Sequence, residues 1–207
     1  GGIIKSQWNL YSSQKEIFNL SKQLKLDLIL FHGRGGSSSR GGGPSGEAIL
    51  SQPLETINGK IKITQQGEVI SDNFANPELS ETNLKIIMSS VLEASLDHPE
   101  ENNKDKKWFD LMNILSDESY SHYKDFISQR NFFDYLTKAT PLEEFAQMNI
   151  GSRPSKRRGG LKGIEDLRAI PWVFAWTQSR QIIPGWYGFG HTIEKAFNDG
   201  LREEILE

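Results

Sequence analysis

The sequence of 207 residues contains no cysteine, no long apolar run and no surplus of positive charge. Without cysteine, the chain cannot form a disulfide, a thiolate metal site or a cysteine nucleophile. A membrane-spanning helix needs about 18 to 20 consecutive apolar residues, and the sequence has no such run. The first residues also lack the basic and hydrophobic segments of a secretion signal. These absences predict a cytoplasmic protein that neither enters a membrane nor uses thiol chemistry.

The residues that are present are typical of a globular protein, since 36% are hydrophobic and 25% are charged. The formal net charge of -3 argues against general affinity for nucleic acid, because binding to the phosphate backbone normally requires a basic surplus. Any site for an anion must therefore be local. The chain opens on glycine and enters a helical pattern without a capping residue, which is typical of either a processed chain or an excerpt of a longer protein, and we favour the excerpt. We expect residues 1–207 to form a single partial domain.

Helical periodicity dominates the chain. Apolar residues recur at three- and four-residue steps over residues 3–24, again from residue 79 onward, and from about residue 191. The capping-box sequence Thr-Pro-Leu-Glu, which begins at Thr140, predicts a short helix that ends near Met148. The polar residues 97–107 are typical of a solvated linker. The sequence therefore predicts a mainly helical fold.

Strands are expected only in the first third of the sequence. Residues 27–31 form a short apolar run next to a glycine cluster, which is typical of a strand buried on both faces. After the glycines, Pro44 predicts the first turn of a helix that carries the apolar residues 48–50. Residues 57–70 alternate weakly and contain two turn signals, which predicts strand pieces around turns.

The glycine-rich loop at residues 31–44 has the sequence FHGRGGSSSRGGGP. Glycine lets the backbone approach a ligand closely, and consecutive amides in such turns form concavities that bind anions. Arg34 and Arg40 add planar donors that bind phosphate or carboxylate in a bidentate manner. The loop also leaves the end of the expected strand, where α/β enzymes place their sites. The pattern predicts a site for a small polyanion.

Other interpretations of this loop are a flexible low-complexity segment and an arginine- and glycine-rich RNA-binding segment. Such segments belong to disordered tails, whereas this loop joins an apolar strand to an apolar helix. A nucleotide-binding loop is excluded, because no Lys-Ser or Lys-Thr pair ends a Walker pattern and the glycine spacing does not fit a dinucleotide-binding turn.

A second basic segment runs from Arg153 to Arg168 and contains six cationic side chains but only two carboxylates. A solvated loop is the plain alternative, and Arg157 and Arg158 fit it best. Arg168 differs, because it lies between Leu167 and an apolar run and is expected to be partly buried. A buried guanidinium requires an anionic partner.

Five blocks of the sequence resemble the phosphoenolpyruvate carboxylases, in the order in which that family has them. The blocks are residues 31–44, LSQP at 50–53, QGEVI at 66–70, residues 149–158 and LRAIPWVFAWTQ at 167–178. Five blocks in register are hard to obtain by chance, and the resemblance is weakest over residues 97–107. The chain thus resembles an internal stretch of the C-terminal half of such an enzyme.

The resemblance implies a fold, a reaction and a set of site residues. The fold is mainly α with α/β barrel elements: part of an eight-stranded β/α barrel with many surrounding helices. The reaction forms oxaloacetate and phosphate from phosphoenolpyruvate and bicarbonate. Every species in it is an anion, so fixed cations are expected to stabilise the transition states. The implied catalytic residues are His32, Arg34 and Arg168, and the implied substrate-binding residues are Gln66, Arg153 and Arg40.

Arg40 has a second implied role. In the family, the glycine-rich loop that carries this arginine is similar to a switch, which binds the carboxylate of inhibitory aspartate or malate when the enzyme is inactive. A loop rich in glycine suits an element that changes position. Relatives commonly carry a bulkier residue within the stretch that is Ser37-Ser38-Ser39 here, and this departure bears on the strength of feedback inhibition.

The resemblance also implies Mg²⁺ or Mn²⁺ and a homotetramer, with neither nucleic acid nor membrane as a partner. The family's metal ligands and the catalytic histidine of its His-Pro-Thr motif have no counterpart in the matched blocks, so we assign no metal ligand here and expect the chain alone to be inactive. His98, His122 and His191 lie outside the blocks and are interpreted as surface or packing residues. The rival functions are a non-catalytic anion- or RNA-binding module and a regulatory relative that binds a dicarboxylate.

Overall fold

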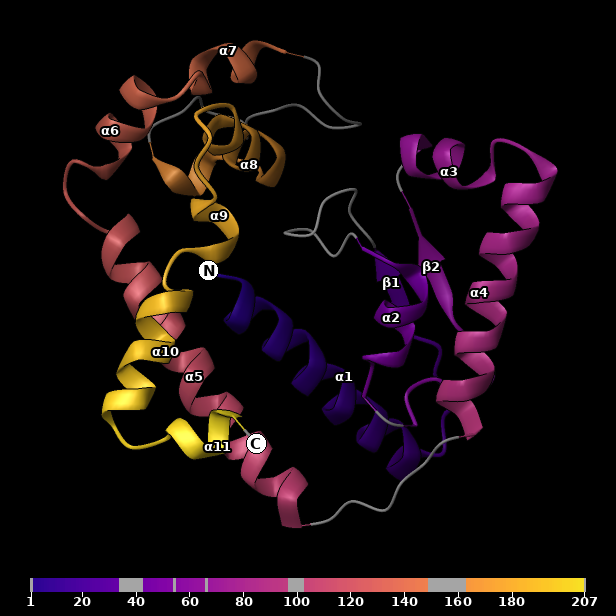
Figure 1. Cartoon of the computed structure of the whole chain (residues 1–207). Coiled ribbons are helices and arrows are strands. Elements are labelled where there is room, and N and C mark those ends of the chain that lie inside the picture. The colour runs from indigo at the N-terminus through magenta and orange to yellow at the C-terminus, as the bar shows by residue number, and fades with distance from the viewer. Residues whose placement is uncertain are drawn as a thin grey trace. The chain divides into compact units, whose positions relative to one another are not determined.

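The computed structural model describes residues 2–33, 43–53, 55–65, 67–96, 103–148 and 163–206. Over these residues the chain is mainly helical, as predicted (Figure 1). The chain divides into two compact units. We call Gln7–Lys106 the N-terminal unit, and Gly1–Ser6 together with Lys107–Glu207 the C-terminal unit. No helix of the described residues is long and apolar enough to cross a membrane.

The N-terminal unit combines helices with a short parallel strand pair. Strands β1 and β2 pair with His32 opposite Ile63, and helices α2 and α3 both pack against α4 (Figure 1). Its elements are α1 (Ile3–Leu24, which begins in the other unit), β1 (Phe31–Gly33), α2 (Ser45–Leu50), β2 (Lys62–Thr64), α3 (Gly67–Phe74) and α4 (Pro77–Leu96).

The packing of α2 against α4 depends on a glycine. A Cβ atom at Gly46 would lie 2.9 Å from Oγ of Ser90 and 3.2 Å from Cγ2 of Ile86, so a larger residue would force these side chains or α2 itself to shift. The start of α4 follows from its sequence, because Oδ1 of Asn76 accepts a hydrogen bond from the Leu79 amide at 2.9 Å and Pro77 occupies the first helical position. Local sequence thus sets where α4 begins, and small residues set how closely α2 approaches it.

Several predictions for this unit are confirmed and two are wrong. Helix α1 covers residues 3–24 and α2 follows Pro44, as predicted. The strand begins only at Phe31, which is 60% exposed, so a strand over residues 27–31 buried on both faces is wrong. Among the described residues β1 pairs only with β2. An apolar run predicts a strand but does not supply the elements that would cover it.

The predicted strand pieces at residues 57–70 are confirmed only for β2. From Gly67 onward the chain is helix α3, because its apolar residues lie on a helical face that packs against α4. The side-chain amide of Asn83 donates to the carbonyl oxygen of Asn73 at 2.8 Å and links α4 to the end of α3.

The C-terminal unit consists of helices. Its elements among the described residues are α5 (Asn103–Ile127, which begins in the other unit), α6 (Phe132–Ala139), α7 (Leu142–Gln147), a short 3-10 helix (Ile164–Asp166), α8 (Ala169–Gln178), α9 (Ile183–Trp186), α10 (Phe189–Asn198) and α11 (Arg202–Leu206). Residues 103–107 are the first turn of α5, so the predicted linker is wrong there, and residues 97–102 lie outside the described residues.

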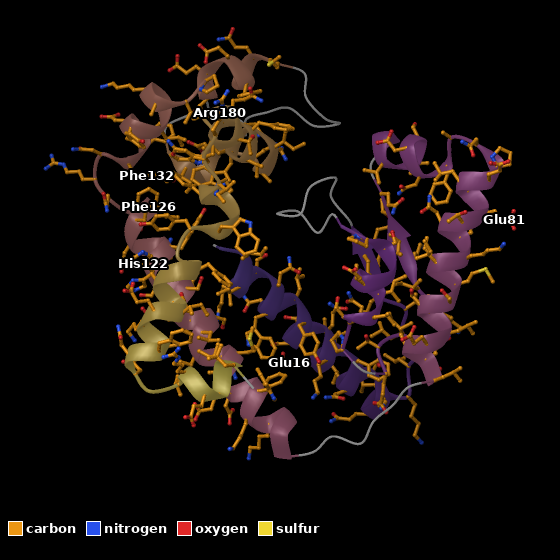
Figure 2. The ribbon with its side chains drawn as sticks, in the orientation of Figure 1. Glu16, Glu81, His122, Phe126, Phe132 and Arg180 are labelled. Carbon is orange, nitrogen blue, oxygen red and sulfur yellow. The ribbon has the colours of Figure 1, made fainter. Side chains whose placement is uncertain are left out.

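The main core of this unit lies among α6, α7 and α8. Leu136, Leu142 and Trp176 are fully buried in it. Phe126 near the end of α5 meets Phe132 of α6 edge to face, with ring centroids 4.8 Å apart (Figure 2). Full burial of one large apolar side chain stabilises the fold by about 1.5 to 3 kcal/mol. These helices therefore form a hydrophobic core of their own.

Helix α7 was predicted correctly, but its capping box was not. Thr140 does not cap α7, because its hydroxyl donates instead to the carbonyl oxygen of Leu136 at 2.6 Å. The hydroxyl thereby satisfies an orphan carbonyl at the end of α6. The threonine of the motif thus bonds to the end of α6 rather than to the beginning of α7.

Candidate functional site

Arg168 is the predicted site residue for which the structure gives most detail. It precedes α8, and its neighbour Leu167 is buried in the core. As the sequence predicts, Arg168 is partly buried. Its Nε atom is fully buried and has no hydrogen-bonding partner within the part of the chain that the structure describes. A desolvated guanidinium nitrogen of this kind favours an anionic partner.

The helix that follows Arg168 adds to this preference. The first turn of α8 carries no acidic side chain, so no carboxylate on the helix offsets the positive end of its dipole. The carbonyl oxygen of Arg168 accepts a hydrogen bond from the Trp172 amide at 3.2 Å, which fixes the arginine backbone to the first turn. The guanidinium of Arg168 and the N-terminus of α8 are both groups that can bind an anion.

His32 is the second described member of the predicted site. It lies at the centre of β1, where it pairs with Ile63 of β2, and its side chain is partly buried. Burial lowers the pKa of the imidazole below its ordinary value of 6.5, which favours the neutral ring. A neutral imidazole carries one donor and one acceptor, so His32 can donate a hydrogen bond to an anion without adding a charge.

The other predicted site residues, Arg34, Arg40, Gln66 and Arg153, lie outside the described residues. Arg34 directly follows β1 in sequence, and Gln66 directly precedes α3. His32 belongs to the N-terminal unit and Arg168 to the C-terminal unit. The convergence of these side chains on one site stays a prediction.

A model of the family described as phosphoenolpyruvate carboxylase matches residues 1–207. The chain belongs to the phosphoenolpyruvate carboxylase family. Among curated members, the enzymes of Corynebacterium glutamicum, Bradyrhizobium diazoefficiens and Trichormus variabilis are 43%, 44% and 42% identical to it. These matches cover 97%, 94% and 99% of the chain but only 22%, 21% and 20% of the relatives. The chain therefore spans about a fifth of the length of these phosphoenolpyruvate carboxylases.

The described part of this family member does not contain a metal centre. No group of three or more histidine, aspartate or glutamate side chains within it could hold a metal ion. Mg²⁺ and Mn²⁺ require several oxygen ligands that converge on one point. The described residues thus do not fit a divalent metal.

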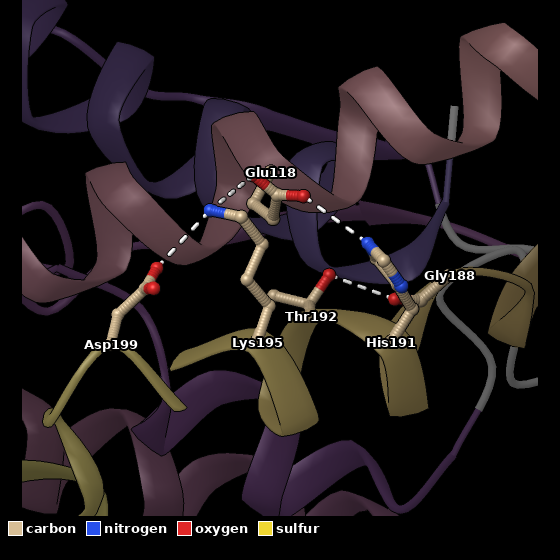
Figure 3. A network of polar contacts seen from close by, with 6 residues as sticks. All are labelled: Glu118, Gly188, His191, Thr192, Lys195 and Asp199. Atoms are coloured by element: carbon tan, nitrogen blue, oxygen red, sulfur yellow. Dashed lines mark hydrogen bonds and ion pairs between the residues drawn. The ribbon is translucent and has the colours of Figure 1, made fainter. Parts of the chain in front are cut away.

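A polar network between α5 and α10 was not predicted from the sequence (Figure 3). One carboxylate oxygen of Glu118 contacts Nε2 of His191 at 3.3 Å, and the other contacts Nζ of Lys195 at 3.1 Å. The rings of His122 and His191 stack with centroids 3.8 Å apart. Both histidines therefore pack against each other, in agreement with their interpretation as packing residues, whereas His98 lies outside the described residues.

The pKa of Lys195 in this network is raised by its hydrogen bonds to Glu118 and Asp199. A sequence signal for the network exists within each helix, because Glu118 and His122, like His191 and Lys195, are four residues apart and share a helical face. Nothing in the sequence indicates that these two faces meet. For this member of the phosphoenolpyruvate carboxylase family, the network joins α5 to α10 and contains no predicted site residue.

The N-terminal unit contains a cavity of about 170 Å³. It lies beside α2 and α4 and is lined by Ile49, Gln52, Ile57 and Glu93, among others. Neither His32 nor Arg168, the two predicted site residues that the structure describes, is among its lining residues.

Proposed function

We propose that the chain supplies the glycine- and arginine-rich, anion-binding part of a phosphoenolpyruvate carboxylase active site. The complete enzyme forms oxaloacetate and phosphate from phosphoenolpyruvate and bicarbonate. The observation that carries this proposal is Arg168, whose buried Nε has no hydrogen-bonding partner among the described residues and which precedes a helix whose first turn carries no acidic side chain. Membership of the phosphoenolpyruvate carboxylase family supports phosphoenolpyruvate and bicarbonate as the anions.

The proposed chemistry passes phosphate from phosphoenolpyruvate to bicarbonate, which leaves carboxyphosphate and the enolate of pyruvate. Carbon dioxide released from carboxyphosphate is then captured by the enolate. Negative charge moves between oxygen atoms throughout, so preorganised cations stabilise the transition states more than the ground state. Arg34, Arg153 and Arg168 hold the phosphate and carboxylate groups together with Gln66. His32 borders the same pocket and donates a hydrogen bond from its neutral ring.

The strand pair supports a place for the chain in a larger β/α barrel. Strands β1 and β2 are parallel and are joined through α2, which is the connection that such barrels use. The exposure of Phe31 fits a strand that other elements of the enzyme cover. The glycine-rich loop follows β1, where barrel enzymes place their sites. We infer that residues 1–207 form part of one such domain, in a cytoplasmic homotetramer.

The divalent cation of the family is assigned to no residue of this chain, because the described carboxylates do not converge. When bound, such an ion acts as a Lewis acid toward enolate oxygen. We therefore expect the purified chain of 207 residues to lack carboxylase activity, although its arginines can still bind phosphate weakly. The assay couples oxaloacetate to malate dehydrogenase in the presence of Mg²⁺ or Mn²⁺ and bicarbonate. Turnover above the blank would contradict this assignment.

The proposed role of Arg168 is tested in the complete enzyme. Arg168→Lys keeps the charge but loses the planar fork, so kcat/KM for phosphoenolpyruvate is expected to fall about tenfold or more, which corresponds to about 1.4 kcal/mol. The matched control is Arg180→Lys, since Arg180 is exposed and follows the other end of α8 (Figure 2). The control is expected to be nearly silent. Equal effects of the two substitutions would refute the proposal.

We further propose that Arg40 binds both substrate and inhibitor, as its place in the glycine-rich loop implies. Arg40→Gly in the complete enzyme is expected to reduce carboxylation and to weaken inhibition by aspartate or malate. Dose-response curves measure the second effect. Unchanged inhibition together with intact activity would remove both roles from Arg40.

A further inference from the structure

The cavity of the N-terminal unit is large enough for a small organic molecule. Helix α2, the segment that follows it and helix α4 all contribute residues to its wall. Ile49 and Ile57 of this wall are each only 2% exposed, so the cavity adjoins the buried interior of the unit. An apolar cavity of about 150 Å³ can hold benzene. The volume of about 170 Å³ therefore suits a ligand of about six non-hydrogen atoms.

Hydrogen bonds hold the wall of the cavity in place. The hydroxyl of Thr56 donates to the carbonyl oxygen of Pro53 at 2.7 Å, and the Gly59 amide donates to Oγ of Ser95 on α4 at 2.8 Å. The segment that follows α2 is thereby tied to α4. Gly46 allows α2 itself to approach α4 closely. The wall is therefore formed before any ligand arrives, which is usual for small-molecule sites.

Two polar side chains of the wall carry oxygen atoms that can accept hydrogen bonds. Nε2 of Gln52 donates to the carbonyl oxygen of Ala48 at 2.6 Å. This bond fixes the orientation of the amide, because the reversed amide would bring two acceptor oxygens together. Oε1 of Gln52 is buried and has no hydrogen-bonding partner among the described residues. Glu93 of α4 adds an exposed carboxylate. An unsatisfied acceptor and a negative charge favour a ligand that donates hydrogen bonds and is positively charged.

We propose that this cavity binds a small organic cation, namely a protonated amine on a short apolar body. The ammonium group donates charge-assisted hydrogen bonds to the Glu93 carboxylate, and the apolar body packs against Ile49 and Ile57. An anion of similar size is disfavoured, because it would be repelled by Glu93. The inference does not depend on the proposed function, since it uses neither His32 nor Arg168.

The experiment compares cyclopentylammonium with cyclopentanol, which has nearly the same size and shape but no charge. Ligand-observed NMR titrations of the complete enzyme measure both dissociation constants. We expect the ammonium ion to bind about tenfold more tightly than the alcohol, because only the ion forms a charge-assisted hydrogen bond. Glu93→Gln is expected to remove this preference and to leave the affinity for the alcohol unchanged. The matched control is Glu81→Gln, since Glu81 lies on α4 but not among the lining residues (Figure 2), and it is expected to have no effect.

A second variant tests the location of the ligand. Ala94→Leu adds volume to the wall and is expected to weaken the binding of both test ligands. If this variant does not fold, Gln52→Leu replaces it, removes the unpaired oxygen and is expected to weaken the binding of the ammonium ion. Unchanged affinity for the ammonium ion in the variant used would place that ligand elsewhere and overturn the proposal.

Three further outcomes would also overturn the proposal. Equal affinities for the ammonium ion and the alcohol would show that the charge of Glu93 selects nothing. Equal losses in Glu93→Gln and Glu81→Gln would show only a general attraction of cations to an acidic surface. If neither test ligand binds to the complete enzyme, the cavity is not a ligand site, because other parts of the enzyme fill or close it.

Discussion

The two units differ in how completely they bury their apolar side chains. In the C-terminal unit, helices α6, α7 and α8 enclose fully buried side chains such as Leu136 and Trp176. In the N-terminal unit, large apolar side chains remain exposed on several elements. Trp8, Ile49 and Ile57 are the buried apolar side chains of the N-terminal unit among the described residues. On α4 of the same unit, leucine and methionine side chains at four-residue steps are 49%, 64% and 58% exposed, namely those of Leu84, Met88 and Leu92.

This difference shows that the two units depend on different sources of stability. A helix that is apolar on more than one face is typical of a helix with packing partners on more than one side. Within the N-terminal unit, α4 packs with α2 and α3, yet Leu84, Met88 and Leu92 remain exposed. The C-terminal unit contains the core that supports Arg168, while the N-terminal unit presents surfaces that further parts of the enzyme are expected to cover.

The largest expected effect is on the core of the C-terminal unit. Leu136→Ala removes a fully buried side chain and is expected to lower the free energy of unfolding by about 2 to 5 kcal/mol. Leu92→Ala makes the same chemical change on α4 at 58% exposure, where the expected change is within about 0.5 kcal/mol. Urea denaturation of the 207-residue chain measures both. Similar losses would mean that the two units do not differ as described.

The next effect appears at alkaline pH and belongs to the C-terminal unit. Folding raises the pKa of Tyr123 from 10.0 to about 12, so the unfolded chain releases this proton first. The stabilisation is fully present below pH 10 and is lost as the pH rises toward 12, by about 2 kcal/mol in total. Denaturation curves at pH 8 to 12 for the chain and for Tyr123→Phe isolate the contribution of this proton to the free energy of unfolding. If the difference in free energy of unfolding between the chain and the variant does not depend on pH, the raised pKa of Tyr123 is contradicted.

A smaller effect concerns the turn between α9 and α10. Gly188 has a φ of +88°, and a Cβ atom there would lie 3.3 Å from the carbonyl oxygen of Ser119. Gly188→Ala is therefore expected to destabilise the C-terminal unit by about 1 to 2 kcal/mol. Gly190→Ala is the matched control, because no atom lies within 4 Å of its Cβ position, and it is expected to leave the melting temperature unchanged or slightly raised. If Gly190→Ala melted at a lower temperature than Gly188→Ala, the close approach of Gly188 to the carbonyl oxygen of Ser119 would be refuted.

The smallest effect appears at acidic pH and belongs to the N-terminal unit. Burial lowers the pKa of His32 below 6.5 in the folded state, so the unfolded chain binds this proton first as the pH falls. The free energy of unfolding is therefore expected to decrease below pH 6.5, and His32→Gln is expected to reduce that decrease. Urea denaturation between pH 5 and 8 provides the comparison. An equally steep decrease in the variant would show that His32 is not buried.

Local sequence patterns predicted many of the helices because the period of 3.6 residues is visible within each segment, as in α1. They also predicted the partial burial of Arg168, since its neighbours are apolar on both sides. They failed for residues 27–31, where an apolar run predicted burial but the strand begins at Phe31 and is exposed. At Thr140 they failed because a hydroxyl can serve either of two adjacent helices, and here it bonds back to Leu136.

The candidate site was predicted by resemblance rather than by periodicity, and the described residues give the surroundings of His32 and Arg168 only. The stacking of His122 on His191 could not be predicted, because it joins distant parts of the sequence through the fold. Sequence patterns identify the face of a helix but not the face that it meets.

The most direct test of the central claim is the dissociation constant of phosphoenolpyruvate, measured by calorimetry on the complete enzyme. The account predicts that Arg168→Lys raises this constant about tenfold, because a bidentate contact to an anion is lost, while Arg180→Lys leaves it unchanged. Equal dissociation constants for the enzyme and both variants would contradict the claim that the partly buried Arg168 binds the substrate anion.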